Sequence, residues 1–530
     1  MSSIVRQKIG DKTYLYESTS YRNAEGKPRN KRILVGKLDP VSGNPVYKPE
    51  YLERMAENGT PVAIPVPETT FTAENIRNSS IKEYGAFYLF ESLAEATGLL
   101  SSIKEAVPRH WQELFVLACY LVSSGDPFLY CESWISDTEC LPVGNMSSQR
   151  ISELLFAVTS GQRELFYQSW CKIRSEQEYL ALDITSISSY SQLIDDVEWG
   201  YNRDNEQLPQ INFCMLMGEQ SRLPVYQTIY SGSLKDVSTL KTTLAKMNAV
   251  SKGIPRLIVM DKGFFSTKNI NAMLDDSPKL RFIISVPFTS GFAKGQLTSE
   301  GKDIDRLQNT IVVGGDSMRG VTKQRSWNKE HKVYVHVYYN AMKAMKSREE
   351  LYAHVTVLKE QAEKNPVQSA QQDEFKKYLL IRSSEKSSSG YTVNIKEDVV
   401  SAELSTAGWL VMISNDVSDA KKAIAIYREK DVVEKGFLRL KNSLDLGRLR
   451  VHRADSMQNK VFVGFISLIL MSQIHKVMLD NGLYKKMTMK KLLMTLSKLR
   501  VQEINGTRIL FPLTKEQKDI YKAFNVAEPV

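Results

Sequence analysis

Cysteine is scarce in this sequence of 530 residues, and its five copies include no CxxC pair. Their odd number and wide spacing argue against a disulfide framework and against a zinc finger. We therefore expect reduced, buried thiols of the kind found in cytosolic proteins. The five positions are Cys119, Cys131, Cys140, Cys171 and Cys214.

Histidine is also rare, and long apolar runs are missing. The six histidines, among them His336 and His354, show no metal-ligand spacing. The sequence has no P-loop and no Gly-rich dinucleotide motif, so neither ATP nor NAD is indicated. The start, MSSIVRQKIG, predicts no signal peptide. The most apolar segment, 461–471, is too short to cross a bilayer and predicts a buried helix, so we expect no membrane partner.

Positive charge is in moderate excess. The chain has 70 Lys and Arg against 60 Asp and Glu, a net charge of +10. This balance favours a polyanionic partner such as nucleic acid, although many basic proteins bind none. Hydrophobic residues make up 42% of the chain, which suits a globular protein. The length predicts about two to four folded units.

The first part of the chain predicts two regions. Residues 1–65 form a basic region in which TYLYEST and KRILVGKL flank a polar turn, which predicts a β-hairpin. It is either a solvated hairpin or an arm that contacts DNA. The stretch IPVPE at 64–68 predicts a linker. Residues 66–175 follow a helical pattern and form either a DNA-binding module or a plain helical bundle.

Further along, the pattern predicts a mixed sheet with helices. Residues 176–289 give the order strand, strand, strand, helix, strand, helix, strand, and 406–480 complete this core. Between them, 290–405 lack the alternation and predict an inserted domain. Residues 481–530 form a basic C-terminal region, in which Asn505-Gly506 indicates a hairpin.

Two aspartates share a setting, because each closes or interrupts a buried, apolar strand. Asp183 follows YLAL and Asp261 follows LIVM. The ends of central strands in α/β sheets are where ligand sites form, and a half-buried aspartate needs a partner or a cation. Either aspartate alone could equally cap a helix or turn. The pair is more informative than either member.

The segment YREKDVVEKGFLRLK at 427–441 predicts a helix with one functional stripe. At about 100° per residue, Tyr427, Lys430, Glu434 and Lys441 fall within about 60° of one another. Asp431 lies beside the stripe, so geometry alone does not exclude it. A solvated helix with an ordinary Lys430–Glu434 pair is the alternative, but it leaves Tyr427 and Lys441 unexplained.

Together these blocks resemble the DDE transposases of bacterial insertion sequences, in the group with the Tyr-Arg-Glu-Lys signature. The signature spacing matches Tyr427, Lys430, Glu434 and Lys441, with Lys430 where the group usually has Arg. A lysine keeps the charge but loses the planar fork for bidentate phosphate contact. The other blocks are LALDITS with Asp183, MDKGF with Asp261, and YSGSLKDVSTL with Gly232 and Asp236. The matches run from about 147 to 470.

The resemblance implies an α/β fold with an RNase H-like mixed-sheet catalytic core that carries a β-rich insertion. It implies a transposase that binds terminal inverted repeats and target DNA and catalyses strand cleavage and strand transfer. Asp183, Asp261 and Glu434 would be catalytic and would hold two divalent metal ions, Mg²⁺ or Mn²⁺. A bacterial cytoplasmic protein, associated with the nucleoid when bound to DNA, is expected.

The resemblance also implies how DNA would be held. Tyr427, Lys430 and Lys441 would contact phosphates beside the scissile bond, and synapsis of two ends implies a homodimer on DNA. Trp327 would stack on an unpaired base, with a simply packed tryptophan as the alternative. Other functions remain open: a non-catalytic DNA-binding protein derived from a transposase, or an RNase H-like nuclease without strand transfer. The basic charge disfavours a carboxylate-pair glycosidase.

Overall fold

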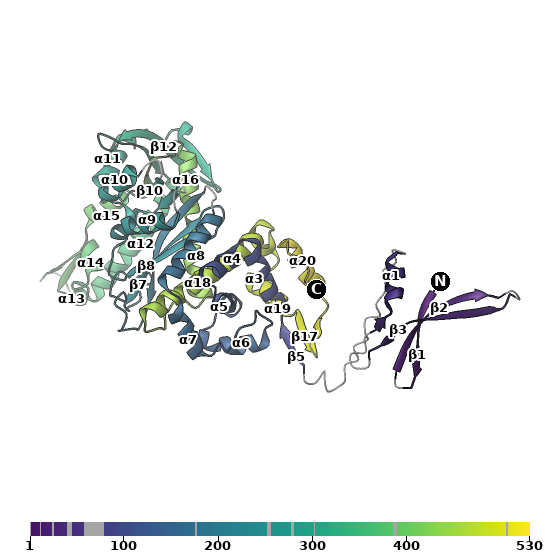
Figure 1. Cartoon of the computed structure of the whole chain (residues 1–530). Coiled ribbons are helices and arrows are strands. Elements are labelled where there is room, and N and C mark those ends of the chain that lie inside the picture. Colours follow the sequence, from purple (N-terminus) through teal and green to yellow (C-terminus); the bar gives the residue numbers. More distant parts are fainter. Residues whose placement is uncertain are drawn as a thin grey trace. The chain divides into compact units, whose positions relative to one another are not determined.

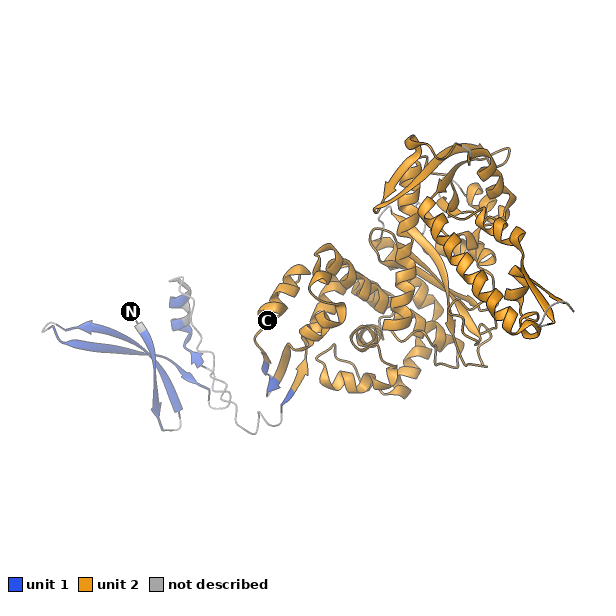
Figure 2. Cartoon of the chain, turned by 180° about the vertical axis from the view of Figure 1, so that it is seen from behind, with its two compact units in different colours: residues 1–80, 503–508 blue, residues 81–502, 509–530 orange. Residues whose placement is uncertain are grey.

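The computed structural model describes residues 2–10, 12–23, 26–39, 45–57, 79–174, 178–251, 256–276, 280–301, 303–384, 390–504 and 507–530. The chain divides into two compact units (Figure 2). The first comprises residues 1–80 with 503–508, and the second comprises 81–502 with 509–530.

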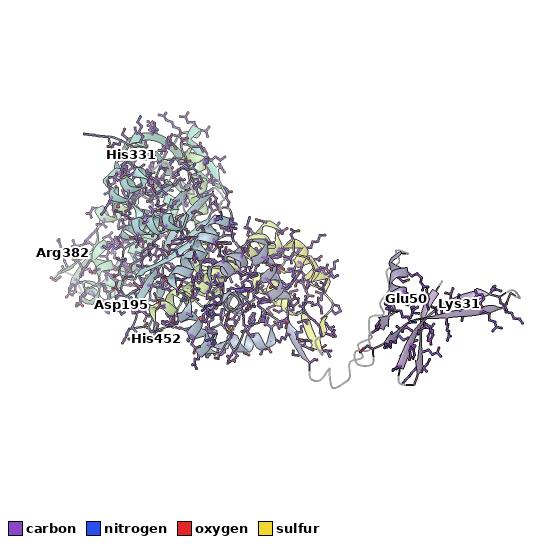
Figure 3. All side chains as sticks on the ribbon, viewed as in Figure 1. Lys31, Glu50, Asp195, His331, Arg382 and His452 are labelled. Carbon is purple, nitrogen blue, oxygen red and sulfur yellow. The ribbon has the colours of Figure 1, made fainter. Side chains whose placement is uncertain are left out.

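The first unit is a small four-stranded sheet with one helix. Its strands, in spatial order, are β1 (Ser2–Ile9), β2 (Lys12–Arg22), β3 (Pro28–Leu38) and β4 (Pro45–Tyr47), followed by α1 (Pro49–Glu57). The antiparallel pairing of β2 with β3 confirms the predicted hairpin. Its buried core is Leu15, Val35 and Tyr51, while Lys31 and Glu50 lie on β3 and α1 (Figure 3). The predicted linker lies outside the described residues.

The second unit begins with helices that pack around one long helix, α18 (Ala454–Asp480). They are α3 (Gly85–Ala96), α4 (Leu99–Ala106), α5 (Trp111–Ser124), α6 (Cys131–Asp137), α7 (Ser148–Ala157) and α8 (Ser160–Ile173). α18 contacts α5 and α7, so the buried helix predicted at 461–471 is confirmed and is longer than expected. It is long and apolar enough to cross a membrane, yet 83% of its most apolar window is buried inside the fold.

A nine-stranded mixed sheet forms the other half of this unit (Figure 1). Its spatial order is β11-β12-β13-β16-β10-β9-β6-β7-β8. The bounds are β6 (Tyr179–Ser188), β7 (Gln210–Gly218), β8 (Pro224–Ser231), β9 (Arg256–Met260), β10 (Leu280–Ser285), β11 (Thr310–Val313), β12 (Asp316–Ser326), β13 (Lys332–Tyr339) and β16 (Trp409–Ser414). β6, β9 and β10 are neighbouring parallel strands, whereas the other pairings are antiparallel.

Helices connect and cover these strands in the predicted order. α9 (Asp236–Ser251) joins β8 to β9, and α10 (Thr267–Asp275) joins β9 to β10. The expected sequence of strands and helices over 176–289 is therefore confirmed. α11 (Gly291–Glu300) follows β10, while α16 (Ala420–Glu429) and α17 (Asp431–Ser443) follow β16. α17 contacts β6 and β7.

The expected inserted domain has a different boundary from the one predicted. β11, β12 and β13 extend the central sheet, because β16 pairs with both β13 and β10. The side chains of β13 are mostly buried, so this strand is an interior strand of the sheet rather than part of an appendage.

Among the described residues of 290–405, the segment from about 341 to 404 has a hydrophobic cluster of its own. It consists of α12 (Ala341–Lys364), α13 (Pro366–Ser369), α14 (Asp373–Tyr378), β14 (Leu379–Ser383), β15 (Tyr391–Ile395) and α15 (Glu397–Leu404). This segment is mainly helical, with one two-stranded sheet, rather than β-rich as predicted.

The C-terminal region contains α19 (Met489–Ser497), β17 (Arg500–Ile504), β18 (Thr507–Leu510) and α20 (Lys515–Ala523). β18 neighbours β17 in a three-stranded sheet that also includes β5 (Ser80–Glu83), which confirms the predicted hairpin. The turn residues Asn505 and Gly506 lie outside the described residues.

Candidate active site

Three parallel strands bring polar side chains to one edge of the sheet. In the strand register Leu182 is opposite Met260, and Met260 is opposite Ile284. The next residues along these strands are Asp183, Asp261 and Ser285. Asp261 and Ser285 stand at the carboxyl ends of β9 and β10, whereas Asp183 lies inside β6, which continues beside β7 to Ser188. The register places the three residues at the same level of adjacent parallel strands, where the carboxyl ends of β9 and β10 form the kind of place at which ligand sites occur in α/β proteins.

Asp261 is held by several hydrogen-bond donors. Its Oδ1 accepts from the Lys262 N–H at 2.7 Å, from Ser285 Oγ at 3.0 Å and from the Tyr427 hydroxyl at 2.9 Å. Burial by itself raises the pKa of Asp261, but these donors and the Lys430 ammonium outweigh burial and hold it below its usual value. Asp261 is therefore an anion at neutral pH.

For Asp183, burial outweighs the groups that stabilise its anion. Burial raises its pKa to about 6, and the neighbouring charge of Asp261 adds to the rise. The Ile184 N–H, which donates to Asp183 Oδ1 at 2.8 Å, and the cations Lys430 and Arg203 offset only part of it. The surroundings of Asp261 thus favour its anion, whereas the cations near Asp183 do not outweigh the effect of burial.

The predicted signature helix is two helices rather than one. α16 ends at Glu429, α17 begins at Asp431, and Lys430 is the junction residue. The predicted stripe assumed one continuous helix. Because the rotation per residue changes at the break, the predicted angle between Tyr427 in α16 and the residues of α17 is wrong. Tyr427 lies in α16 and Glu434 in α17, and the break still directs both side chains toward Lys430.

Lys430 is the central cation of the site. Its Nζ donates to Glu434 Oε1 at 2.8 Å and lies 5.8 Å from the centre of the Tyr427 ring. Burial lowers the pKa of Lys430, but the attraction of Glu434, Asp261 and Asp183 outweighs burial and raises it. A single ammonium therefore interacts with all three predicted catalytic carboxylates.

Glu434 reaches this group from the solvent side. Its side chain is 52% exposed, whereas that of Lys430 is 13% exposed. The other acid considered, Asp431, forms an ion pair with Lys435 at 2.5 Å. Within the described residues, Glu434 is thus the acid of this helix that shares a cation with the two aspartates.

Lys441 and Trp327 are engaged elsewhere. Lys441 Nζ donates to Asp204 Oδ2 at 2.5 Å, in the loop that joins β6 to β7. Trp327 Nε1 donates to Asn271 Oδ1 at 2.7 Å, and its ring makes edge contacts with Phe265 and Phe292. The structure therefore brings Tyr427, Lys430 and Glu434 to the aspartates, and it holds Lys441 and Trp327 in other contacts.

Comparison with known proteins identifies the family of this site. The family described as Transposase DDE domain matches residues 174–470, which is more than half of the chain. The chain belongs to this family. No curated protein matches the chain. One similar solved structure is that of a piggyBac transposase synaptic complex with hairpin DNA, with 12% identity, a TM-score of 0.38 and 78% of each chain covered.

Two residues of this DDE transposase domain were missed by the sequence analysis. Ser285 ends the buried strand RFIIS and bonds to Asp261, so the same pattern that revealed the aspartates could have revealed it. Arg203 was not detectable, because it lies in the irregular β6–β7 loop. Its Nη2 donates to Asp236 Oδ1 at 2.5 Å and to Oδ2 at 2.6 Å, and its charge offsets part of the rise in the pKa of Asp183 that burial causes.

The segment with Gly232 and Asp236 packs against residues next to the site. A Cβ on Gly232 would lie 2.1 Å from the backbone oxygen of Gln210 and 2.5 Å from that of Glu198, so only glycine fits. Asp236, at the start of α9, lies close to Gly263, just after Asp261. This arrangement ties α9 to the sheet edge that carries the two aspartates.

Whether the site suits a divalent cation depends on which carboxylate oxygens are available as ligands. Within the described residues, Asp183 Oδ2 and Asp261 Oδ2 accept no hydrogen bond, so each aspartate keeps one hard donor. No three acidic, His or Cys groups in the described part of the chain are arranged to hold a metal ion. The free Oδ2 atoms of the two aspartates suit such a cation, but Glu434 is turned to Lys430 and does not complete the set.

Proposed function

We propose that this chain is the transposase of a bacterial insertion sequence, in the group with the Tyr-Arg-Glu-Lys signature. It binds double-stranded DNA at the terminal inverted repeats of its element and at the target, and it catalyses strand cleavage and strand transfer. The observation that carries the proposal is the meeting of Asp183 and Asp261, on adjacent parallel strands, with Tyr427 and Lys430 from the signature segment.

The proposal includes an RNase H-like core and the other domains predicted from the sequence. Its support is the order of elements: an antiparallel meander β6-β7-β8, then β9 and β10 added parallel to β6 through α9 and α10. In this arrangement the two aspartates come from the first and fourth strands of the core, and the glutamate comes from a helix that contacts the sheet.

Two divalent ions, Mg²⁺ or Mn²⁺, are part of the proposal. Asp183 and Asp261 would hold them, joined by Glu434 once its carboxylate exchanges Lys430 for a metal ion. Such ions stabilise the charge on the attacking and leaving oxygens of a displacement at phosphorus. Lys430, released from Glu434, would then be free to bind a DNA phosphate beside the scissile bond.

In the proposal, Lys441 and Trp327 also bind DNA, and each first leaves its present partner. Lys441 leaves Asp204 for a phosphate, and Trp327 leaves the contacts around Asn271 to stack on an unpaired base. The net charge of +10 supports a polyanionic partner. A homodimer on paired element ends, in the cytoplasm and on the nucleoid, completes the proposal.

The test uses wild type and two matched variants, Glu434→Gln and Asp431→Asn. Both remove one negative charge from the first turn of α17, but only Glu434 pairs with Lys430. A labelled duplex with the terminal repeats is incubated with Mg²⁺, Mn²⁺ or EDTA. We expect metal-dependent nicking and joined product with wild type and Asp431→Asn, and a loss of at least about 100-fold in rate with Glu434→Gln.

Other outcomes lead to other functions. Nicking without joined product indicates an RNase H-like nuclease. Repeat binding without metal-dependent nicking by wild type indicates the non-catalytic DNA-binding protein. A loss with Asp431→Asn but not with Glu434→Gln makes Asp431 the third acid.

A further inference from the structure

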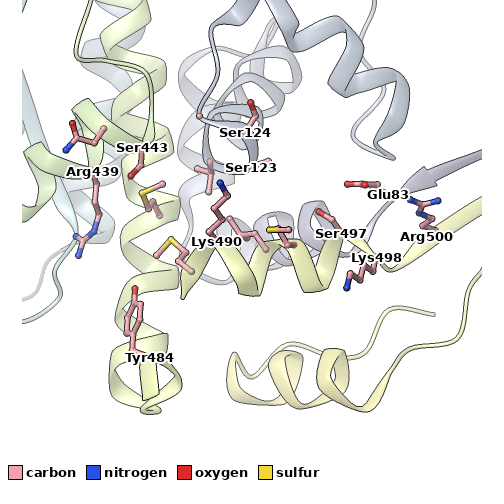
Figure 4. Close-up of a pocket in the computed structure, with 17 residues that line it drawn as sticks. Glu83, Ser123, Ser124, Arg439, Ser443, Tyr484, Lys490, Ser497, Lys498 and Arg500 are labelled. Carbon is pink, nitrogen blue, oxygen red and sulfur yellow. The ribbon is translucent and has the colours of Figure 1, made fainter. Parts of the chain in front are cut away.

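A groove of about 740 Å³ lies beside α17, on a side of this helix other than the one that carries Glu434. Arg439, Asn442 and Ser443 of α17 form one wall, one face of α19 and the end of α5 form others, and single residues of β5, α18 and β17 also line it (Figure 4). Arg439 is five residues beyond Glu434, which places it about 140° around the helix and about 7.5 Å along its axis. The groove is therefore near the candidate active site but does not share its surface.

The charged side chains of this groove are almost all positive. Arg439, Lys490, Lys498 and Arg500 face a single carboxylate, Glu83. Within the described residues, none of the four cations makes a side-chain hydrogen bond or ion pair. Lys490 projects from α19 toward the segment of Ser123 and Ser124, across the space of the groove (Figure 4).

Burial lowers the pKa of His475 to about 4, and the charges of Arg439, Arg222 and Lys435 add to this effect. Burial lowers the pKa of Arg439 too, and Arg222 adds to that effect. Gathering like charges in a half-buried place costs free energy, which an anionic ligand would offset.

Neutral hydrogen-bond donors lie between the cations. The hydroxyl of Ser123 is buried and has no hydrogen-bond partner within the described residues. Ser124, Ser443, Ser497 and Asn442 also line the groove. Cations interleaved with serine and asparagine side chains are the groups that contact DNA phosphates.

We propose that this groove binds the sugar-phosphate backbone of a DNA segment at a second contact surface, on the face of α17 opposite the candidate active site. This inference rests on the proposed function, because it needs DNA as the ligand. The cations at the two ends of α19, Lys490 and Lys498, are eight residues and about 12 Å apart. Since successive phosphates of one strand rise by about 3.4 Å, the two lysines would contact different phosphates.

The experiment compares two double variants of the full chain. Lys490→Gln with Lys498→Gln removes two groove cations. Lys486→Gln with Lys491→Gln removes two exposed lysines that do not line the groove but lie on or beside the same helix. DNA binding is measured against salt concentration in EDTA, where no cleavage occurs. Each phosphate contact contributes about 0.9 to the slope of log affinity against log salt.

We expect the groove variant to lose about 1.8 from this slope and about tenfold or more in affinity at moderate salt. The control variant should keep the wild-type slope. Equal slopes for the two variants would overturn the groove proposal and leave the proposed function standing if wild type still cuts DNA. Absence of any DNA binding by wild type would overturn both. Binding of an acidic polyglutamate through the groove lysines, with DNA binding unaffected, would assign the groove to a protein ligand and overturn the DNA assignment.

Discussion

At the scale of single residues, Asp183 and Asp261 are the same side chain under opposite conditions. Asp261 accepts three hydrogen bonds on one oxygen, and its pKa is lowered. Asp183 accepts one from its own successor, and its pKa rises to about 6. Neighbouring carboxyl groups with separated pKa values are a frequent feature of catalytic sites, because like charges resist ionising together.

The raised pKa of Asp183 predicts how the free energy of unfolding depends on pH. Between the ordinary value of 3.8 and the folded value of about 6, the folded chain binds the proton more strongly than the unfolded chain. Stability is therefore lost as the pH rises through this window. In EDTA at pH 8, the free energy of unfolding of Asp183→Asn, measured in urea, should be about 1–3 kcal/mol higher than that of wild type. The difference should vanish near pH 4.

The matched control for this prediction is Asp431→Asn, an exposed acid of the adjacent helix. Exposed ion pairs contribute little, so this variant should follow wild type at both pH values. A wild type that is as stable as Asp183→Asn at pH 8 would show that the Asp183 carboxylate is already compensated in the folded chain.

At the scale of elements, the break between α16 and α17 decides which side chains meet. A continuous helix predicts that Tyr427 shares one stripe with Glu434 and Lys441. Glu434 and Lys441 both lie in α17 and keep their common stripe, so the break at Lys430 changes only how Tyr427 is placed relative to them. The Tyr427 hydroxyl reaches Asp261, while Lys441, about two turns beyond Glu434, reaches Asp204. The sequence offers no proline or glycine at this point, so the local sequence does not predict the break.

Another element depends on a single glycine. The turn at Gly232 leaves no space for a side chain, because the backbone oxygens of Gln210 and Glu198 would be 2.1 and 2.5 Å from a Cβ. Gly232→Ala should therefore destabilise the chain by about 1–3 kcal/mol in urea unfolding. Gly291→Ala, where nothing lies within 4 Å, should be neutral or slightly stabilising. Equal midpoints for the two variants would contradict the predicted close contact.

At the scale of the whole molecule, the two units differ greatly in core size. The buried core of the first unit is three residues, Leu15, Val35 and Tyr51, whereas the second unit has an extensive core around α18 and the sheet. Small domains bury too little apolar surface to be very stable. The two units are therefore expected to unfold in separate transitions.

The tryptophans make this expectation measurable. All six lie between Trp111 and Trp409, within the second unit. Deleting residues 1–57 should leave the urea midpoint of tryptophan fluorescence unchanged. The isolated fragment 1–57 should have a stability below about 3 kcal/mol by circular dichroism. A large shift of the fluorescence midpoint on deletion would show that the first unit stabilises the second.

Local patterns in the sequence were sufficient for several features. The apolar runs that precede Asp183 and Asp261, the alternation of strands and helices, and the spacing of Tyr427, Lys430 and Glu434 are all short-range signals. They arise because burial of a strand or a helix face constrains residues that are near in sequence. The family of the chain was accessible from the same motifs.

Only the tertiary structure decided the contacts between distant segments. The register of β6, β9 and β10 places Ser285 beside Asp261, and the β6–β7 loop brings Arg203 near Asp183 and Asp204 to Lys441. The addition of β11 to β13 to the sheet, and the gathering of Arg439, Lys490 and Lys498 along one groove, belong to the same class. These features depend on which strands and helices become neighbours, and that choice is set by the packing of the whole core rather than by any local pattern.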